Sequence, residues 1–162
     1  MVILGIDPGF GITGYGLIEV RASDTRHPKL LEAGILSSKQ KKHLSERILE
    51  IYSSLDSILD EFSPKAMAIE DTYSIHAFPK SAILIGYVQG IVHLAAAQRK
   101  IPIFTYYPLQ VKKALLGNGR ATKAQTQRMI QTAFSLHAPP RPDDVADALA
   151  VALCHAQRMR AA

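Results

Sequence analysis

Apolar residues in the first part of the chain form short continuous runs that are separated by polar or glycine-rich stretches. Runs over residues 2–6, 13–20 and 29–36 are rich in β-branched and other apolar side chains, so each predicts a strand. The polar stretch 21–28 between the last two strands predicts a hairpin tip. Three neighbouring strands with short links indicate an antiparallel meander.

The rest of the chain alternates between helical spacing and short apolar runs. Predicted helices cover residues 44–62, 81–99, 108–116, 122–134 and 144–159, the last two capped by Thr122 and Asp143, and predicted strands cover 66–69 and 101–105. This order is typical of an α/β protein in which a mixed sheet, with an antiparallel meander and later parallel strands, is flanked by helices. At 162 residues, we expect residues 1–162 to form a single domain.

The predicted helix 81–99 is apolar on nearly all sides, which is typical of a helix buried on more than one face. Gly86 and Gly90 lie four residues apart and would let another backbone approach closely. We therefore favour a homodimer through this helix, although the chain's own helices could also cover it. A membrane span is disfavoured, because the apolar stretch is short and contains Gln89 and His93.

Composition adds a weak indication of a polyanionic partner. The chain has a net charge of +5 and a pI of about 9.4, and 48% of its residues are hydrophobic. Cys154 is the single cysteine, which excludes an internal disulfide and indicates a reducing compartment. No signal peptide is visible at the N-terminus, so we expect a cytoplasmic protein.

Four carboxylates lie where sites are commonly built. Asp7 ends the first strand, Glu70 ends the strand 66–69, and Asp144 and Asp147 share one face of the last helix. Each alone has an ordinary explanation, as a turn residue, a surface charge or an acid at a helix N-terminus. Taken together, they predict convergence at one edge of the sheet.

Converging carboxylates without Cys or His partners favour hard cations such as Mg²⁺ or Mn²⁺. Two such ions can activate water and stabilise the leaving oxygen of a phosphodiester, which predicts a nuclease. Gly9 and Gly11 would leave room for a phosphate backbone. A nucleotide-binding fold of the sugar kinase and actin type is the rival, but it needs two domains and the chain is too short.

The motifs GIDPG, TGYG, AIE, LQVKKAL and DDVADALAVAL occur in this order, and the chain resembles the RuvC family of bacterial Holliday junction resolvases over nearly its whole length. The resemblance implies a ribonuclease H-like fold, a homodimer and paired symmetric nicks in four-way DNA junctions that leave 5′-phosphates. It also implies two Mg²⁺ per site, with Mn²⁺ as a substitute, and RuvA–RuvB as partners. The implied metal ligands are Asp7, Glu70, Asp144 and Asp147, with Asp143 as an extra acid.

The resemblance further assigns DNA contacts to five residues. Lys112 and Lys123 match basic positions near the scissile phosphate, and Tyr73 matches an aromatic implicated in stacking on unpaired bases; a loop tyrosine that packs on the protein is the alternative. The loop around it is one residue longer than in the family's pattern. Its basic contact falls on His76 or has moved to Lys80.

Two other functions stay open at this point. One is a junction-binding protein that does not cleave, which the four carboxylates argue against. The other is a ribonuclease H-like nuclease that acts on another nucleic acid, such as a ribosomal RNA precursor or a transposon end. The helix motif VADALAVAL and the spacing of the two lysines argue against it by analogy with the family.

Overall fold

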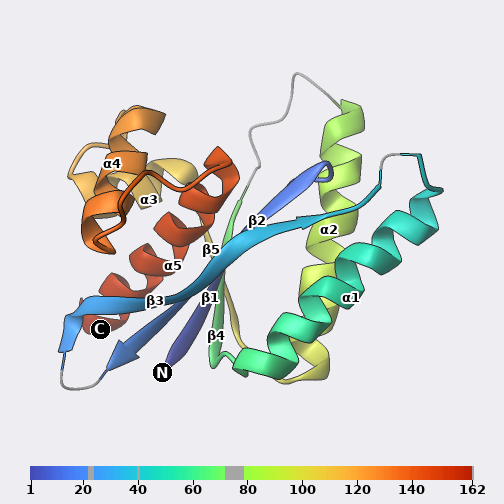
Figure 1. The fold of residues 1–162 in the computed structure, drawn as a ribbon, viewed down its shortest axis with the longest axis horizontal. Coiled ribbons are helices and arrows are strands. Elements are labelled where there is room, and N and C mark those ends of the chain that lie inside the picture. Colours follow the sequence, from blue (N-terminus) through green and yellow to red (C-terminus); the bar gives the residue numbers. More distant parts are fainter. Residues whose placement is uncertain (22–23, 40, 72–78, 162) are drawn as a thin grey trace.

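The computed structural model describes residues 1–21, 24–39, 41–71 and 79–161 of the chain (Figure 1). Its centre is a five-stranded sheet in the order β3-β2-β1-β4-β5. The strands are β1 (Val2–Asp7), β2 (Ile12–Arg21), β3 (Asp24–Ser37), β4 (Ala66–Glu70) and β5 (Ile103–Tyr106). The helices are α1 (Leu44–Phe62), α2 (Pro79–Gln98), α3 (Pro108–Leu116), α4 (Lys123–Ala133) and α5 (Asp143–Ala161).

The sheet has the predicted mixed character. Strands β1, β2 and β3 pair antiparallel, whereas β4 runs parallel to β1 and β5 runs parallel to β4. The carboxyl ends of β1, β4 and β5 therefore meet at one edge of the sheet, as parallel strands require. This edge carries both strand-end carboxylates that the sequence singled out.

The predicted hairpin between the second and third strands is confirmed, but its predicted tip over residues 21–28 is too long. Strand β2 continues to Arg21 and β3 already begins at Asp24, with these two residues paired. Register shifts along the β2–β3 ladder accommodate the extra residues of β3, so polar residues and Pro28 lie within a strand. A pattern of polar residues with a proline does not distinguish such an irregular strand from a turn.

The two faces of the sheet are covered by different helices (Figure 1). Helix α5 packs on one face and forms a core with small residues and Leu149, and α3 and α4 lie beside it. Helices α1 and α2 cover the other face, where Ile51, Leu55 and Val88 are buried against the strands. Alternation along β1 supplies both cores, because Ile3 faces one cluster and Leu4 the other.

Glycines on β1 and β2 allow α5 to lie directly on the backbone of the sheet. A Cβ on Gly5 would lie 2.0 Å from the carbonyl oxygen of Ala148, and a Cβ on Gly14 would lie 2.0 Å from that of Asp144. Gly16, the cross-strand partner of Gly5, instead faces the side chain of Leu149, which a Cβ would meet at 2.4 Å. At Gly5 and Gly14, no other residue type fits without displacement of α5, because the atoms met are backbone.

Helix α2 has an exposed apolar face. Ile83, Tyr87 and Leu94 are 59%, 42% and 54% exposed, and a Cβ on Gly86 or Gly90 would meet no described atom within 4 Å. By length and composition alone, the segment Lys80–Gln98 could also cross a membrane, and 28% of it is buried. The second face of this helix is therefore not covered by the described part of the chain.

Candidate active site

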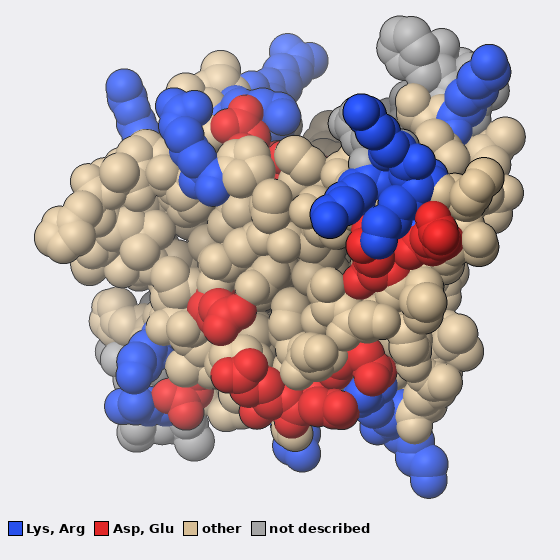
Figure 2. Space-filling view, turned by 45° about the vertical axis from the view of Figure 1, so that its right-hand side comes forward, with Lys and Arg blue, Asp and Glu red and all other residues tan. Residues whose placement is uncertain are grey.

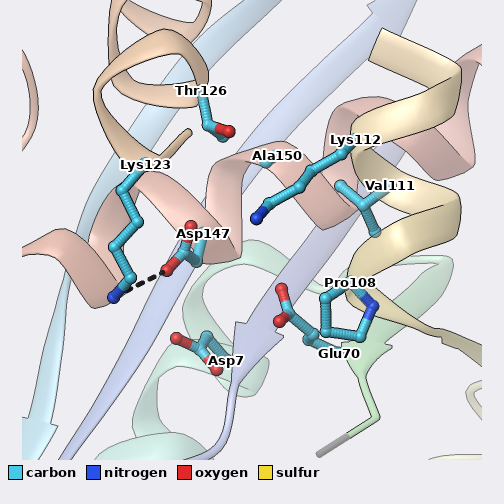
Figure 3. A pocket seen from close by; sticks show the side chains of 9 residues that line it. All are labelled: Asp7, Glu70, Pro108, Val111, Lys112, Lys123, Thr126, Asp147 and Ala150. Atoms are coloured by element: carbon cyan, nitrogen blue, oxygen red, sulfur yellow. Dashed lines mark ion pairs between the residues drawn. The ribbon is translucent and has the colours of Figure 1, made fainter. Parts of the chain in front are cut away.

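Two carboxylates lie on adjacent parallel strands at the same edge of the sheet. Asp7 is the last residue of β1 and Glu70 is the last residue of β4, and the preceding residues Ile6 and Ile69 are register partners. Helix α5 adds Asp147 from the layer above, because the glycines beneath it allow close approach. The three carboxyl groups line one cavity of about 280 Å³ (Figure 3).

Two lysines approach the same cavity from the helices beside α5. Lys112 comes from α3 and Lys123 from the first turn of α4, and both side chains reach towards the carboxylates (Figure 3). The Nζ atom of Lys123 lies 4.0 Å from Oδ2 of Asp147. Acidic and basic groups therefore share the cavity, so the lysines could bind an anionic phosphate while the carboxylates hold a cation beside it.

Apolar groups complete the cavity wall. Val111 is buried on α3, Ala150 is buried on α5, and Pro108 begins α3. Thr126 from α4 is also buried, and its hydroxyl donates to the carbonyl oxygen of Thr122. Sequence reasoning did not identify this wall, although the position of Thr126 three residues after Lys123 places both on one side of α4.

Burial and mutual repulsion disfavour ionisation of the carboxyl groups. The pKa of Asp7 is raised to about 7, mainly by burial and also by the charges of Asp147 and Asp144, and the charge of Lys123 opposes this shift. Burial, followed by the charge of Asp7, raises the pKa of Glu70 to about 8, with Lys112 opposing the shift. The pKa of Asp147 is also raised, mainly by burial. A bound cation would favour the ionised forms.

The donor chemistry fits a hard divalent metal. All three cavity carboxylates offer only oxygen atoms, and their negative charge is concentrated in a partly buried space. Among the described residues, no three Asp, Glu, His or Cys side chains already form a compact ligand cluster. The carboxylates of Asp7, Glu70 and Asp147 thus face a common cavity but do not form a compact ligand cluster.

The two acids at the start of α5 lie differently from Asp147. Asp144 does not line the cavity, but its charge contributes to the raised pKa of Asp7, which places it nearby. Asp143 is the first residue of α5, and its Oδ1 accepts a hydrogen bond of 2.6 Å from Nε2 of Gln127. Asp143 therefore ties α4 to α5, a role that sequence spacing did not reveal.

The predicted loop contacts are only partly described. Tyr73 and His76 lie outside the described residues. Lys80 is exposed in the first turn of α2 and does not line the cavity.

Comparisons with known proteins agree with one another. The model of the family "Crossover junction endodeoxyribonuclease RuvC" matches residues 3–155. A crossover junction endodeoxyribonuclease RuvC from Ruminiclostridium cellulolyticum is 42% identical over 160 residues, which cover 99% of this chain and 94% of that protein. Thermus thermophilus RuvC in complex with a Holliday junction substrate gives a TM-score of 0.92 at 34% identity, covering 99% of this chain and 96% of the other.

A more distant likeness concerns the fold alone. The yeast mitochondrial Holliday junction resolvase Ydc2 gives a TM-score of 0.64 at 12% identity, covering 96% of this chain and 78% of the other. Together with the Thermus structure, it confirms the predicted ribonuclease H-like arrangement of sheet and helices.

Proposed function

Because this chain belongs to the RuvC family of crossover junction endodeoxyribonucleases, we propose that Asp7, Glu70, Asp144 and Asp147 hold the metal with which it resolves four-way DNA junctions. It is a divalent-metal-dependent endodeoxyribonuclease that binds Holliday junction DNA and acts in recombination and repair. The observation that carries the site assignment is the cavity shared by Asp7, Glu70, Asp147 and two lysines.

The metal is proposed to be Mg²⁺, two ions per site, with Mn²⁺ as a substitute. When bound, such ions lower the pKa of water and stabilise the leaving oxygen of a phosphodiester. Asp7, Glu70 and Asp147 supply oxygen ligands from three separate elements, and Asp144 supplies a fourth from the preceding turn of α5.

The protein's own groups position the DNA backbone. Lys112 and Lys123 bind non-bridging oxygens of the scissile phosphate and its neighbour, which offsets the repulsion between DNA and the carboxylates. The apolar wall of Pro108, Val111 and Ala150 limits solvent on that side of the cavity. Hydrolysis leaves a 5′-phosphate and a 3′-hydroxyl.

Paired cleavage requires two sites with two-fold symmetry. The exposed apolar face of α2, with Ile83, Tyr87 and Leu94, supports a homodimer through this helix. The open backbone at Gly86 and Gly90 would let a second α2 approach closely. A symmetric dimer then presents one cavity to each of two strands of like polarity.

The remaining assignments follow from family membership. We propose that residues 1–162 act as one nuclease domain, that the protein works in the cytoplasm, and that RuvA–RuvB supplies the junction. Tyr73 is proposed to stack on an unpaired base at the crossover. His76 or Lys80 is proposed to bind the DNA backbone beside it; Lys80 is exposed and available for this contact.

The test is cleavage of a mobile synthetic four-way junction with Mg²⁺ or Mn²⁺. We expect paired symmetric nicks from the wild type. Asp7→Asn should cut at least about a thousand-fold more slowly, a loss of roughly 4 kcal/mol of transition-state stabilisation, because a charged ligand is removed. Asp60→Asn, at an exposed acid on α1, is the matched control and should cut normally.

Each alternative function predicts a different result. Tight junction binding without nicks in either metal would indicate a binding protein with an inactive site. Cleavage of RNA or of linear DNA ends in preference to junctions would indicate another nuclease of this fold. Equal rates for Asp7→Asn and the wild type would remove Asp7 from the metal site.

A further inference from the structure

The link between β3 and α1 carries a group of basic residues that the catalytic assignment does not use. Lys39, Lys41 and Lys42 are all exposed, and Arg47 follows in the first turns of α1. Residues 38–50 contain these four cationic side chains and two carboxylates, Glu46 and Glu50. The segment therefore has a net positive charge of two.

Both carboxylates of this segment already have partners. Glu50 forms an ion pair with Lys42 and accepts the backbone N–H of Lys39, and Glu46 accepts the backbone N–H of His43. Within the described part of the chain, the ammonium groups of Lys39 and Lys41 form no ion pair. Their charge is therefore available to an external anion.

Strand pairing places this segment on the edge of the sheet that carries the active site. Asp7 at the end of β1 pairs with Gly14 of β2, and Ile12 at the start of β2 pairs with Ser37 at the end of β3. Glu70 lies on the other side of Asp7, at the end of β4. The order along this edge is thus the ends of β4 and β1, the turn 8–11, and the basic segment (Figure 1).

Arg47 fixes the basic segment to the turn that follows Asp7. Its Nε donates to Oγ of Ser38 at 2.9 Å, and its Nη2 donates to the carbonyl oxygen of Phe10 at 3.3 Å. The guanidinium also stacks over the Phe10 ring at 3.9 Å. The two segments are therefore held side by side at a defined separation.

The turn itself is braced from within and is open outward. The buried Thr13 hydroxyl donates to the carbonyl oxygen of Gly9 at 2.6 Å. A Cβ on Gly11 would meet no described atom within 4 Å, so the outer side of the turn faces free space. A nucleic-acid strand leaving the cavity could pass over this turn without steric obstruction.

Cations thus lie on both sides of the carboxylates. Lys112 and Lys123 border the cavity on the side of α3 and α4, and the basic segment lies beyond Asp7 on the side of α1. In Figure 2, the upper part of the molecule carries several clusters of Lys and Arg side chains and fewer acidic ones, whereas at the lower edge Lys and Arg lie among most of the acidic side chains. The upper clusters are typical of a surface followed by a phosphate backbone.

We propose that Lys39 and Lys41 bind backbone phosphates of the junction arm that extends from the cleavage site over the turn 8–11. The proposal rests on the proposed function, because it takes the scissile strand to lie in the carboxylate cavity. These contacts are made to phosphate, so they hold the arm in place without reading its sequence. Arg47 is a positioning residue, whose charge is directed at Phe10 and Ser38 rather than at DNA.

The test is the salt dependence of junction binding, measured without divalent metal so that no cleavage occurs. For Lys39→Gln/Lys41→Gln, the negative slope of log Kobs against log salt concentration should become shallower, its magnitude decreasing by about 0.9 for each phosphate that the variant no longer neutralises. Kd at low salt should rise at least about five-fold. Lys39→Arg/Lys41→Arg retains both charges and should restore the wild-type slope.

Lys65→Gln/Lys100→Gln is the matched control, because it removes the same net charge. Lys65 and Lys100 are exposed and precede β4 and β5, so they lie at the opposite edge of the sheet. This control should change the slope by less than about half of the value expected for one phosphate. Equal slopes for the two double variants would overturn the proposal.

The outcomes separate this proposal from the function on which it rests. If the wild type neither binds nor nicks four-way junctions, the proposed function fails. If the wild type nicks junctions while Lys39→Gln/Lys41→Gln keeps the wild-type slope, only the contact surface is wrong. The proposal would also be overturned if the salt dependence becomes shallower in Lys39→Gln/Lys41→Gln but Lys39→Arg/Lys41→Arg does not restore it, since phosphate accepts either cation.

Discussion

The two faces of the sheet are packed by opposite means. On the α5 face, glycines of the strands meet the backbone of a helix rich in Ala, so helix and sheet approach closely. On the α1 and α2 face, large aliphatic side chains such as Ile51, Leu55 and Met67 separate the layers. The first face bears the cavity carboxylates Asp7 and Asp147, and the second leaves part of α2 exposed.

The close packing of α5 on the sheet determines where the cavity carboxylates lie. Asp147 reaches the cavity of Asp7 and Glu70 because α5 lies directly on β1 and β2, so the site depends on sterically exact contacts. Bulky packing on the other face is more tolerant of size changes, because side chains can adjust their rotamers. We therefore expect substitutions on the two faces to affect different properties.

The largest expected effect comes from adding a methyl group beneath α5. Gly14→Ala places a Cβ against the carbonyl oxygen of Asp144, which is backbone and cannot rotate away. It should lower the free energy of unfolding by about 3 kcal/mol. Gly11→Ala makes the same change in open space and should shift it by less than about 1 kcal/mol. Urea denaturation of the metal-free proteins measures both, and equal values would contradict the close-packing account.

The next effect concerns the exposed face of α2. Ile83→Glu/Leu94→Glu adds charge to the apolar surface and should raise the dimer dissociation constant at least about a hundred-fold, or roughly 2.7 kcal/mol, without unfolding the monomer. Leu49→Glu on α1, at a residue 62% exposed, is the matched control. Sedimentation equilibrium distinguishes them. A double variant that dimerises like the wild type would place the dimer interface elsewhere.

The smallest effect is a pH dependence at the far end of α5. His155 is 3% exposed, its Nδ1 lies 2.7 Å from the hydroxyl of Tyr106, and its ring stacks on Phe104 at 4.2 Å. Among the described residues, Nε2 has no hydrogen-bond partner. Burial lowers the pKa of His155 below its ordinary value of 6.5. The neutral ring is thus favoured in the folded state.

The direction in which His155 changes the stability with pH follows from the number of protons bound in each state. Below pH 6.5 the unfolded chain binds a proton that the folded His155 does not, so stability falls as pH decreases from 7.5 to 5.5, by at most about 1.4 kcal/mol. Asp7 and Glu70 act in the opposite direction without metal, because their raised pKa values favour protonation of the folded state. The measured quantity is therefore the unfolding free energy of the wild type minus that of His155→Leu at each pH. This quantity should fall as the pH decreases from 7.5 to 5.5, and a constant value would contradict the assignment.

Most of the helices and strands, and the three carboxylates that line the cavity, could be predicted from the sequence. Asp7 and Glu70 end apolar runs that become adjacent parallel strands, and their convergence was predicted from that rule alone. Asp147 was predicted from its place on a packed helix, whereas Lys112 and Lys123 were identified through family resemblance. The position of Asp144 as a ligand stays a prediction.

Features that depend on contacts between distant segments were not predicted. Gly5, Gly14 and Gly16 look like flexible residues in the sequence, and their steric role becomes visible only with α5 in place. The hydrogen bond between Gln127 and Asp143 likewise joins two helices whose relative position no local pattern specifies. The irregular β2–β3 ladder was missed because its bulges mimic a turn in composition.

The chain order of the site has a consequence for protein synthesis. Asp7, Glu70 and Asp147 lie on β1, β4 and α5, and α5 follows every other described helix and strand along the chain. A nascent chain therefore carries two of the three cavity carboxylates long before the third is translated. Without α5, the glycine surface of β1 and β2 also lacks its cover. A truncated product that lacks α5 therefore lacks Asp147 and cannot complete the cavity of three carboxylates.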